Sequence, residues 1–242
     1  MIVTAVKTRE RVVALTFDDG PDERFTPALL DVLEDASAPA SFFVLGCALN
    51  PGSEQIVARM HAAGHDVCNH TYSHLSLADV DAATIEQEIL RTHHALEEIT
   101  QQPPTLVRPP YGHGFTAVDE VARTLGYRAT VHWSAWADDW TLPPPPAATI
   151  VDRVSRGHAG LKGVRRGGIV LLHDGCAPDR AGQSRGETVD AVRALIPRLR
   201  SDGYGLVTVS DLLEVGGAAA AEAGAGRTSP LSRAGGLWRR LR

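Results

Sequence analysis

The chain has 242 residues, of which 43% are hydrophobic, and its 24 Lys and Arg against 29 Asp and Glu give a formal net charge of -5 at pH 7. This length suits one domain of the α/β-barrel class, and the apolar content is sufficient to bury a core, which excludes wholesale disorder. An acidic body argues against nucleic acid as a partner, because a phosphate backbone is bound by clustered Lys and Arg.

The cysteines and the first residues bear on the compartment. Cys47, Cys68 and Cys176 are odd in number and lack CxxC spacing, so they predict neither a disulfide framework nor a cysteine zinc site. The opening MIVTAVKTRERVV has no apolar run of signal-peptide length, and no segment resembles a membrane span. We expect a cytoplasmic monomer without a membrane span, or an extracellular protein whose leader has been removed.

Short β-rich apolar segments alternate with longer helical patterns along the chain. Strands are expected near 11–17, 40–45, 65–69, 105–108, 128–133, 168–172 and 205–209. Helices are expected near 24–36, 52–63, 79–101, 115–126, 147–160, 187–202 and 210–215. Such alternation predicts an α/β fold with a parallel sheet, and the number of units is one short of an eightfold barrel. We therefore predict an irregular or incomplete (β/α) barrel of about seven parallel strands.

The composition changes after Val215, first to Gly and Ala and then to Arg with scattered Ser and Pro. We expect residues 1–215 to form the folded domain and residues 216–242 to form a disordered tail. Within the domain, Pro143 to Pro146 predict a stiff extended loop that lies at the rim of a cleft.

Two adjacent carboxylates, Asp18 and Asp19, follow the apolar strand VVALTF. They are expected at the carboxyl end of a barrel strand, which is the end where such barrels carry out catalysis. Adjacent carboxylates repel each other, so keeping both ionised requires a nearby cation such as a bound metal. A turn rich in Asp, Gly and Pro is also common after a strand, so the pair alone does not decide its role.

His70 and His74, in NHTYSH, have the i, i+4 spacing that places two imidazoles on one side of a helical turn, as in zinc sites. The spacing is weak evidence by itself, because His61 and His65 share it beside an expected helix end and are interpreted as structural. His70 and His74 differ because they follow the third expected strand, at the same rim as the carboxylate pair. Two histidines and one carboxylate would leave a coordination position open for water.

Polar or aromatic residues follow three further strands. Each segment alone is better explained as a loop or as packing. Recurrence at the carboxyl ends of five strands favours a catalytic site instead. The residues concerned are Arg108 in RPPYG, Trp133, Trp136, Asp138, Asp139 and Trp140 after the fifth strand, and His173 after the sixth.

The motifs TFDDGP (16–21), NHTYSH (69–74), RPPYG (108–112), DW (139–140) and LLH (171–173) resemble those of the polysaccharide deacetylases, the NodB-like domain or carbohydrate esterase family 4. The resemblance covers roughly residues 10–213. It implies that Asp19, His70 and His74 bind one divalent metal, usually zinc, with cobalt or nickel as alternatives. It also implies that Asp18 is the general base.

The same resemblance assigns the remaining roles. Arg108 would orient Asp18 and pair with Asp139, and His173 would be the general acid. The backbone amide of Tyr111 would help to hold the oxyanion, Leu171 would line the acetyl pocket, and Trp140 would wall the groove.

The chain departs from the family at Trp136, where many members carry an aspartate that tunes the catalytic histidine. We expect Asp138 or Asp174 to substitute for that aspartate. A second expectation is that Trp136 narrows the cleft and alters the substrate.

The leading hypothesis is metal-dependent hydrolysis of an N-acetyl group from an amino-sugar substrate, with release of acetate. The substrate would be a chito-oligosaccharide, a peptidoglycan-like glycan or a small glycosylated metabolite. One alternative is an amidase or O-deacetylase that acts on a non-sugar or xylan-like substrate. Another is a non-catalytic carbohydrate-binding protein, which would predict gaps among Asp18, the three ligands and His173, and none of these residues is missing.

Overall fold

The computed structural model describes residues 1–159 and 162–225. Its core is one sheet in which every strand pair is parallel. The strand order is β1-β6-β5-β4-β3-β2-β8-β7, with β9 paired to β2, and the sheet curls without closing, since β1 and β7 lie at its two ends. The strands are β1 (Ile2–Val3), β2 (Val12–Asp18), β3 (Ser41–Val44), β4 (Asp66–Asn69), β5 (Leu106–Val107), β6 (Ala129–Val131), β7 (Ala135–Trp136), β8 (Gly168–His173) and β9 (Gly205–Leu206). The predicted incomplete (β/α) barrel is confirmed, with β1 and β7 as additional short strands.

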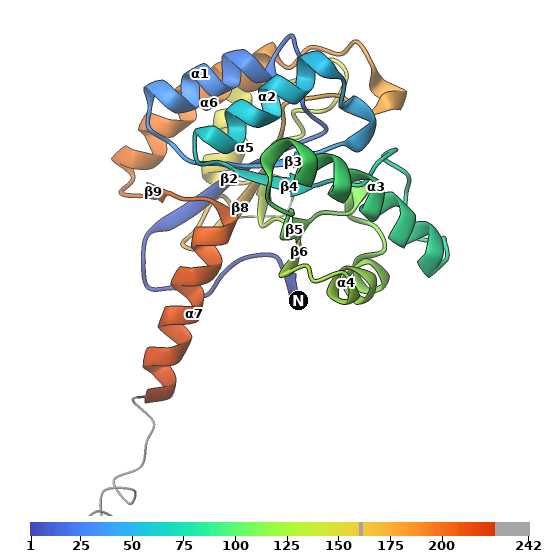
Figure 1. The fold of residues 1–242 in the computed structure, drawn as a ribbon. Helices are drawn as coiled ribbons and strands as arrows, with labels where there is room; N and C mark the ends of the chain where they lie inside the picture. Colours follow the sequence, from blue (N-terminus) through green and yellow to red (C-terminus); the bar gives the residue numbers. More distant parts are fainter. Residues whose placement is uncertain (160–161, 226–242) are drawn as a thin grey trace, which may run out of the picture.

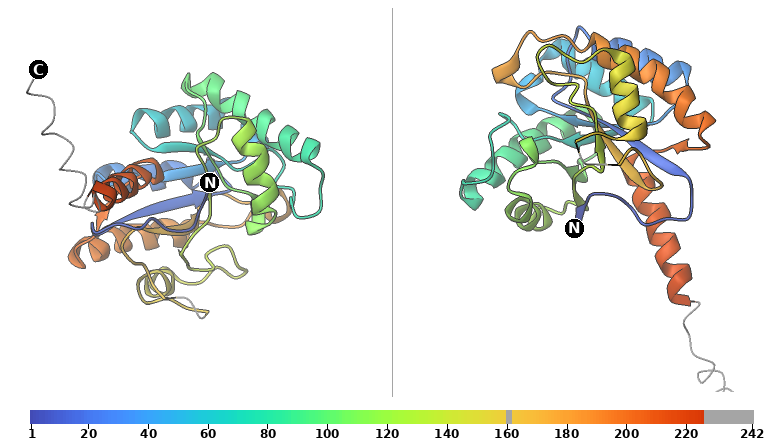
Figure 2. Two further views of the ribbon diagram at one scale, coloured as in Figure 1. Left: turned by 90° about the horizontal axis from the view of Figure 1, so that it is seen from below. Right: turned by 180° about the vertical axis from the view of Figure 1, so that it is seen from behind.

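Helices cover the outside of this sheet (Figure 1). They are α1 (Thr26–Asp35), α2 (Pro51–Ala62), α3 (Ala82–Thr100), α4 (Phe115–Thr124), α5 (Ala147–Arg156), α6 (Gly186–Ser201) and α7 (Val209–Ala225). Short 3-10 turns lie at η1 (Gly46–Ala48), η2 (Pro110–Gly112) and η3 (Pro178–Arg180). Neighbouring helices pack in the order α5, α6, α1, α2, α3, α4, and Figure 2 shows α7 standing apart from this ring.

Alternation along β2 separates the two faces of the sheet. One set of its residues packs outward with α1, α5 and α6 in the larger core, namely Val13, Leu15 and Phe17. Ala14 points to the other face, into the core inside the barrel. Because side chains alternate along a strand, Thr16 and then Asp18 follow Ala14 on the inner face. Asp18, the last residue of β2, therefore points into the barrel at the carboxyl end of the strand.

Helix α7 closes the amino end of the barrel, because Val209 and Leu212 at its start belong to the inner core. The helix continues to Ala225, beyond the domain boundary expected at 215. Residues 226–242 of the expected tail lie outside the described residues. Helix α5 ends at Arg156, earlier than the expected 160, and Gly157 follows it with a φ of 91°. No helix in the described ranges is long and apolar enough to cross a membrane.

Helix α2 begins at a capping box that its sequence encodes. The Asn50 side-chain oxygen accepts hydrogen bonds from the N–H groups of Gly52 (2.9 Å) and Ser53 (3.3 Å), and the Ser53 hydroxyl accepts one from the Asn50 N–H (2.8 Å). These bonds satisfy backbone donors that the helix itself leaves free, and Pro51 has no such donor to lose.

Replacing Asn50 by Ala is expected to lower the free energy of unfolding by about 1 kcal/mol, because the first turn of α2 loses its side-chain acceptor. Urea denaturation of the wild type and the variant measures the difference. Gln55→Ala, at an exposed position of the same helix, is the matched control. Equal losses in the two variants would contradict a capping role for Asn50.

Candidate active site

The predicted site residues converge on one cavity of about 310 Å³ at the carboxyl ends of the strands. Of the ten predicted residues, all line this cavity except Arg108 and Asp139, which are 0% and 1% exposed and lie behind its wall. His61 and His65 lie elsewhere, and the Nδ1 of His65 accepts a hydrogen bond from the Ala40 N–H (3.1 Å). Their interpretation as structural residues agrees with this placement.

The strand register places the expected base and the expected acid side by side. Strands β2 and β8 are neighbours, and Asp18 is paired in register with His173. Leu171 pairs with Thr16, two residues earlier on each strand and on the same inner face, and it is 6% exposed. The order of side chains along these two strands therefore sets the depth of each group in the cavity.

Asp19, His70 and His74 form a candidate metal-ligand set, with one ligand atom of each within 4.8 Å of the others. The Asp19 Oδ1 lies 3.4 Å from the His70 Nε2 and 3.2 Å from the His74 Nε2. This oxygen is buried without a hydrogen-bond partner among the described residues. The His70 Nδ1 lies 2.8 Å from the Arg108 carbonyl oxygen, which accepts its proton and leaves the Nε2 lone pair free for a ligand. The three side chains thus fit a cation.

The pKa of Asp19 reflects the same geometry. Burial alone would raise this pKa, but the nearby imidazoles of His70 and His74 and the charge of His173 hold it well below its usual range. Asp19 is therefore an anion in a buried position, which is the state needed for a ligand.

Several site residues have a backbone conformation that side chains other than glycine rarely adopt. The φ angles are 71° at Asp19, 62° at His74 and 59° at Tyr111. Each such residue costs of order 1 kcal/mol or more, which the surrounding structure must offset. Strain at two of the three candidate ligands and at Tyr111 is consistent with a backbone shaped for a site. The described hydrogen bonds include none from the Tyr111 N–H, so this donor is free to meet a ligand.

Arg108 holds Asp18 as the resemblance implies. Its Nη1 donates to the Asp18 Oδ1 (2.5 Å) and to the Thr16 hydroxyl (2.9 Å), and its Nε donates to the Val131 carbonyl (3.2 Å). The guanidinium also lies 3.9 Å from the centre of the Phe43 ring. One carboxylate oxygen of Asp18 is thereby fixed, and Oδ2 remains directed toward His70 at 3.7 Å from its Nε2.

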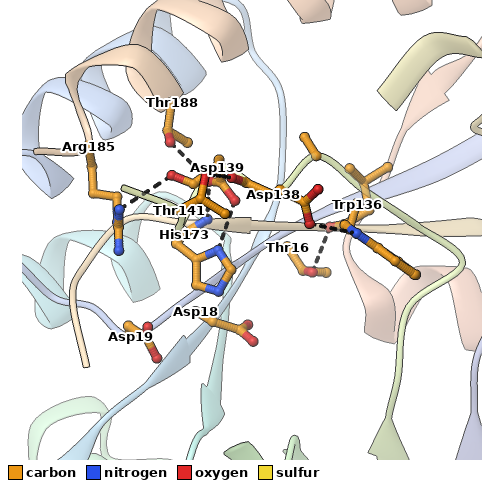
Figure 3. A network of polar contacts seen from close by, with 12 residues as sticks. Thr16, Asp18, Asp19, Trp136, Asp138, Asp139, Thr141, His173, Arg185 and Thr188 are labelled. Carbon is orange, nitrogen blue, oxygen red and sulfur yellow. Dashed lines mark hydrogen bonds and ion pairs between the residues drawn. The ribbon is translucent and has the colours of Figure 1, made fainter. Parts of the chain in front are cut away.

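The expected pairing of Asp139 with Arg108 is wrong, because Asp139 pairs with His173. Its Oδ1 lies 2.9 Å from the His173 Nδ1, and its Oδ2 accepts hydrogen bonds from the His173 N–H (2.8 Å) and the Thr188 hydroxyl (2.9 Å). Figure 3 shows Asp139 between Thr188 and His173. Burial would lower the pKa of His173, but the charge of Asp139 and the hydrogen bond to it raise that pKa above its ordinary value.

The expectation that Asp138 or Asp174 replaces the family aspartate is therefore wrong as well. Asp138 points away from His173, and its Oδ1 accepts a hydrogen bond from the Trp136 indole (3.0 Å), as Figure 3 shows. Trp136 does not line the cavity, so it does not narrow the cleft; Trp133 and Trp140 line it instead. A φ of 53° at Asp138 turns the chain between the two aspartates and sends their side chains in different directions.

Two residues of this network carry no motif and were missed in the sequence. Thr188 lies in the first turn of α6, and Arg185, only 1% exposed, precedes that helix. The Arg185 Nε donates to the Gly175 carbonyl (2.6 Å), and its Nη1 lies 3.4 Å from the Asp139 carbonyl oxygen. Arg185 thus joins the loop after β8 to the loop that carries Asp139. A buried, isolated arginine could have been noticed only from its three-dimensional surroundings.

Asp174 is buried beside the TFDDGP turn. Burial, together with the charge of Asp19, raises the pKa of Asp174 to about 7, and a hydrogen bond from the Thr26 hydroxyl (2.6 Å) opposes this rise. A Cβ on Gly20 would lie 2.1 Å from the Asp174 Oδ2, so only glycine fits between the two. Asp174 therefore packs against the turn behind Asp19 and takes no part in the His173 pair.

The fold and this cavity together define a barrel hydrolase whose candidate metal ligands, base and acid come from the carboxyl ends of neighbouring strands. A family model described as polysaccharide deacetylase matches residues 5–130. The chain belongs to the polysaccharide deacetylase family.

Named relatives agree with this assignment. A chitooligosaccharide deacetylase of Sinorhizobium fredii is 40% identical over 79% of this chain and 87% of its own. The crystal structure of the Bc1960 peptidoglycan N-acetylglucosamine deacetylase is 31% identical over 87% of this chain and 92% of that one, with a TM-score of 0.76. A Bacillus anthracis protein described as a family pseudoenzyme also has a TM-score of 0.76, at 22% identity over 88% of this chain and 69% of that one. The last likeness concerns the fold alone.

Replacing Asp139 by Asn is expected to lower the pKa of His173, because the main charge that raises it is lost. A raised pKa keeps the imidazole protonated to higher pH, so the alkaline limb of the kcat/KM profile should move to lower pH in the variant. Turnover should fall by at least about tenfold, and by no more than the roughly 10²–10⁴ that a positioned acid contributes. Asp138→Asn is the matched control and should leave the limb in place.

Replacing Asp174 by Asn is expected to stabilise the metal-free protein in a pH-dependent way. A carboxyl whose pKa rises from 3.8 to about 7 on folding stabilises the fold below pH 4 and loses that contribution as the pH rises through 7. Between pH 4 and 7, the free energy of unfolding of the variant should therefore rise relative to that of the wild type, by up to about 4 kcal/mol. Urea denaturation from pH 4 to 8 measures this, and parallel curves would contradict it.

Proposed function

We propose that the chain hydrolyses the N-acetyl group of an amino sugar in a glycan, with one divalent metal held by Asp19, His70 and His74. The observation that carries the proposal is the convergence of these ligand atoms beside Asp18 and His173 in one cavity. The relatives described as deacetylases of chitooligosaccharides and of peptidoglycan support a sugar substrate.

Zinc is the metal that the ligand set favours. Two imidazole nitrogens and one carboxylate oxygen are a common three-ligand set for catalytic zinc, and they leave further positions open. Cobalt and nickel accept the same nitrogen and oxygen ligands. When bound, such an ion polarises the acetyl carbonyl and lowers the pKa of a water molecule to about 7.

Asp18 has the geometry of a general base. Arg108 holds its Oδ1, which leaves Oδ2 at the cavity surface to accept a proton from the attacking water. The water oxygen bonds to the acetyl carbon as that proton leaves. Because Arg108 binds Asp18 in a buried position, the base is already oriented before the substrate binds.

His173 is placed to complete the reaction from the neighbouring strand. With Nδ1 bound to Asp139, its Nε2 can donate a proton to the amide nitrogen as the carbon–nitrogen bond breaks. The products are acetate and the free amine of the sugar. Leu171 offers an apolar surface for the acetyl methyl group, and the unused Tyr111 N–H is a donor for the oxyanion.

An amidase or O-deacetylase would use the same groups, since they recognise the acetyl unit and not the molecule that carries it. A panel of chito-oligosaccharides, peptidoglycan fragments and acetylated xylan separates these activities by acetate release, with and without chelator followed by zinc. Release from the first two that is lost with chelator and restored by zinc supports the proposal. Release from xylan alone would favour the O-deacetylase, and a metal-loaded protein silent on every glycan would contradict a sugar N-deacetylase.

Asp18→Asn is expected to retain zinc and to lose nearly all turnover, because the base is removed while the three ligands stay. His74→Ala is expected to lose both, and His61→Ala, outside the cavity, is the matched control that should keep both. Elemental analysis and acetate release measure the two properties. Unchanged zinc in His74→Ala would reject that ligand, and near-wild-type turnover in Asp18→Asn would reject the base.

A further inference from the structure

Arg180 stands at the active-site cavity with no role in the chemistry described above. It ends the 3-10 turn η3 (Pro178–Arg180) in the segment that follows His173. Among the residues that line the cavity it is the sole Lys or Arg.

The hydrogen-bond donors of Arg180 are not used by the protein. Within residues 1–159 and 162–225, no hydrogen bond involves its guanidinium, whereas the buried Arg108 and Arg185 donate to several carbonyl or carboxylate oxygens. The nearest acid is Asp179, whose Oδ2 lies 3.9 Å from the Arg180 Nε and whose side chain is 61% exposed. Such an exposed and distant pair contributes little. The five N–H donors of the arginine therefore remain available to a ligand.

The guanidinium is nevertheless held beside an aromatic ring. It lies over the Trp140 ring, 4.4 Å from the ring centre, and its side chain is 31% exposed. Stacking on an aromatic face leaves the edges of the guanidinium plane free, and those edges carry the donors. A planar donor edge that is already held in place matches a carboxylate, which it can bind through two parallel hydrogen bonds.

The other charges around the cavity do not compete for such a ligand. Asp18 is neutralised by Arg108, and Asp19 faces its two histidines. The acetyl group occupies the region of these residues, so a carboxylate at Arg180 would belong to another part of the substrate. A cavity of about 310 Å³ places that part on the same sugar or on its immediate neighbour.

We propose that Arg180, stacked on Trp140, is a subsite for a carboxylate carried by the glycan next to the acetamido group that is hydrolysed. This inference rests on the proposed function and narrows its substrate class to N-acetylated glycans with acidic substituents. The part of Trp140 that lines the cavity meets the sugar, and the N–H groups of Arg180 meet the acid.

The test compares two oligosaccharides of equal length. One is a neutral chito-oligosaccharide, and the other is a glycan strand freed of its peptides, which bears lactyl carboxylates beside the N-acetylglucosamine units. A third sample is that strand after its carboxylates are converted to amides. The wild type is expected to show a higher kcat/KM on the carboxylate strand than on the other two. Equal values on all three would overturn the subsite.

Variants assign the preference to Arg180. Arg180→Gln should lower kcat/KM on the carboxylate strand by about tenfold, with little change on the neutral oligomer, since one charge-assisted contact is lost. Arg180→Lys should retain part of the preference, and Asp179→Asn should increase it by removing the competing acid. Arg11→Gln is the matched control, because Arg11 lies over the Tyr204 ring at the other end of β2. An equal loss on all three substrates in Arg180→Gln would overturn the proposal.

A binding measurement separates this inference from the proposed function. Calorimetric titration of the Asp18→Asn protein with the carboxylate strand does not depend on turnover. Tighter binding than to the amide form, lost in the Arg180→Gln double variant, supports the subsite even if no glycan is deacetylated. Equal affinity for the carboxylate and amide forms would reject it, whatever the activity.

Discussion

The buried ion pair between Arg108 and Asp18 is the contact on which both the barrel and its cavity depend. Arg108 follows β5, and its guanidinium reaches Asp18 and Thr16 on β2 and the Val131 carbonyl on β6, so one side chain joins three strands across the barrel interior. The Arg108 carbonyl oxygen also accepts a hydrogen bond from the His70 Nδ1, which keeps the proton on that nitrogen. Removing one member of a buried pair leaves an uncompensated charge and typically costs about 3–5 kcal/mol. The residue that orients the proposed base is therefore also part of the core.

Four buried carboxylates lie close together at this site, and each has different partners. Asp18 is paired with Arg108, and Asp139 is paired with His173 and receives a further bond from Thr188. Asp19 faces two imidazoles and keeps an oxygen without a partner, which a cation would satisfy. Asp174 forms no ion pair with any residue that the structure describes, and its pKa is raised to about 7. The opposite pKa shifts of Asp19 and Asp174 thus follow from the groups that surround each carboxylate.

Much of this arrangement could be predicted from the sequence. The alternation of apolar segments and helical patterns identified seven strands, including β5 and β9, which are only two residues long. β1 and β7 are also two residues each, and neither was among the expected strands. The motif residues were found because each follows an expected strand. The partner of Asp139 could not be found in this way, because the choice between two adjacent aspartates depends on the positive φ of Asp138. Arg185 and Thr188 reach the site from α6, which no local pattern connects with β8.

The origin of each group also separates the reaction from the choice of substrate. Asp18, Leu171 and His173 project from β2 and β8, whose register fixes their spacing. Trp140 and Arg180 come from the segments that follow β7 and β8, which can change without altering that register. A protein with the same fold described as a pseudoenzyme shows that the barrel does not guarantee turnover. Under the proposed function, the strand ends therefore supply the groups that hydrolyse the acetamide, while the loops at the rim supply the groups that select the glycan.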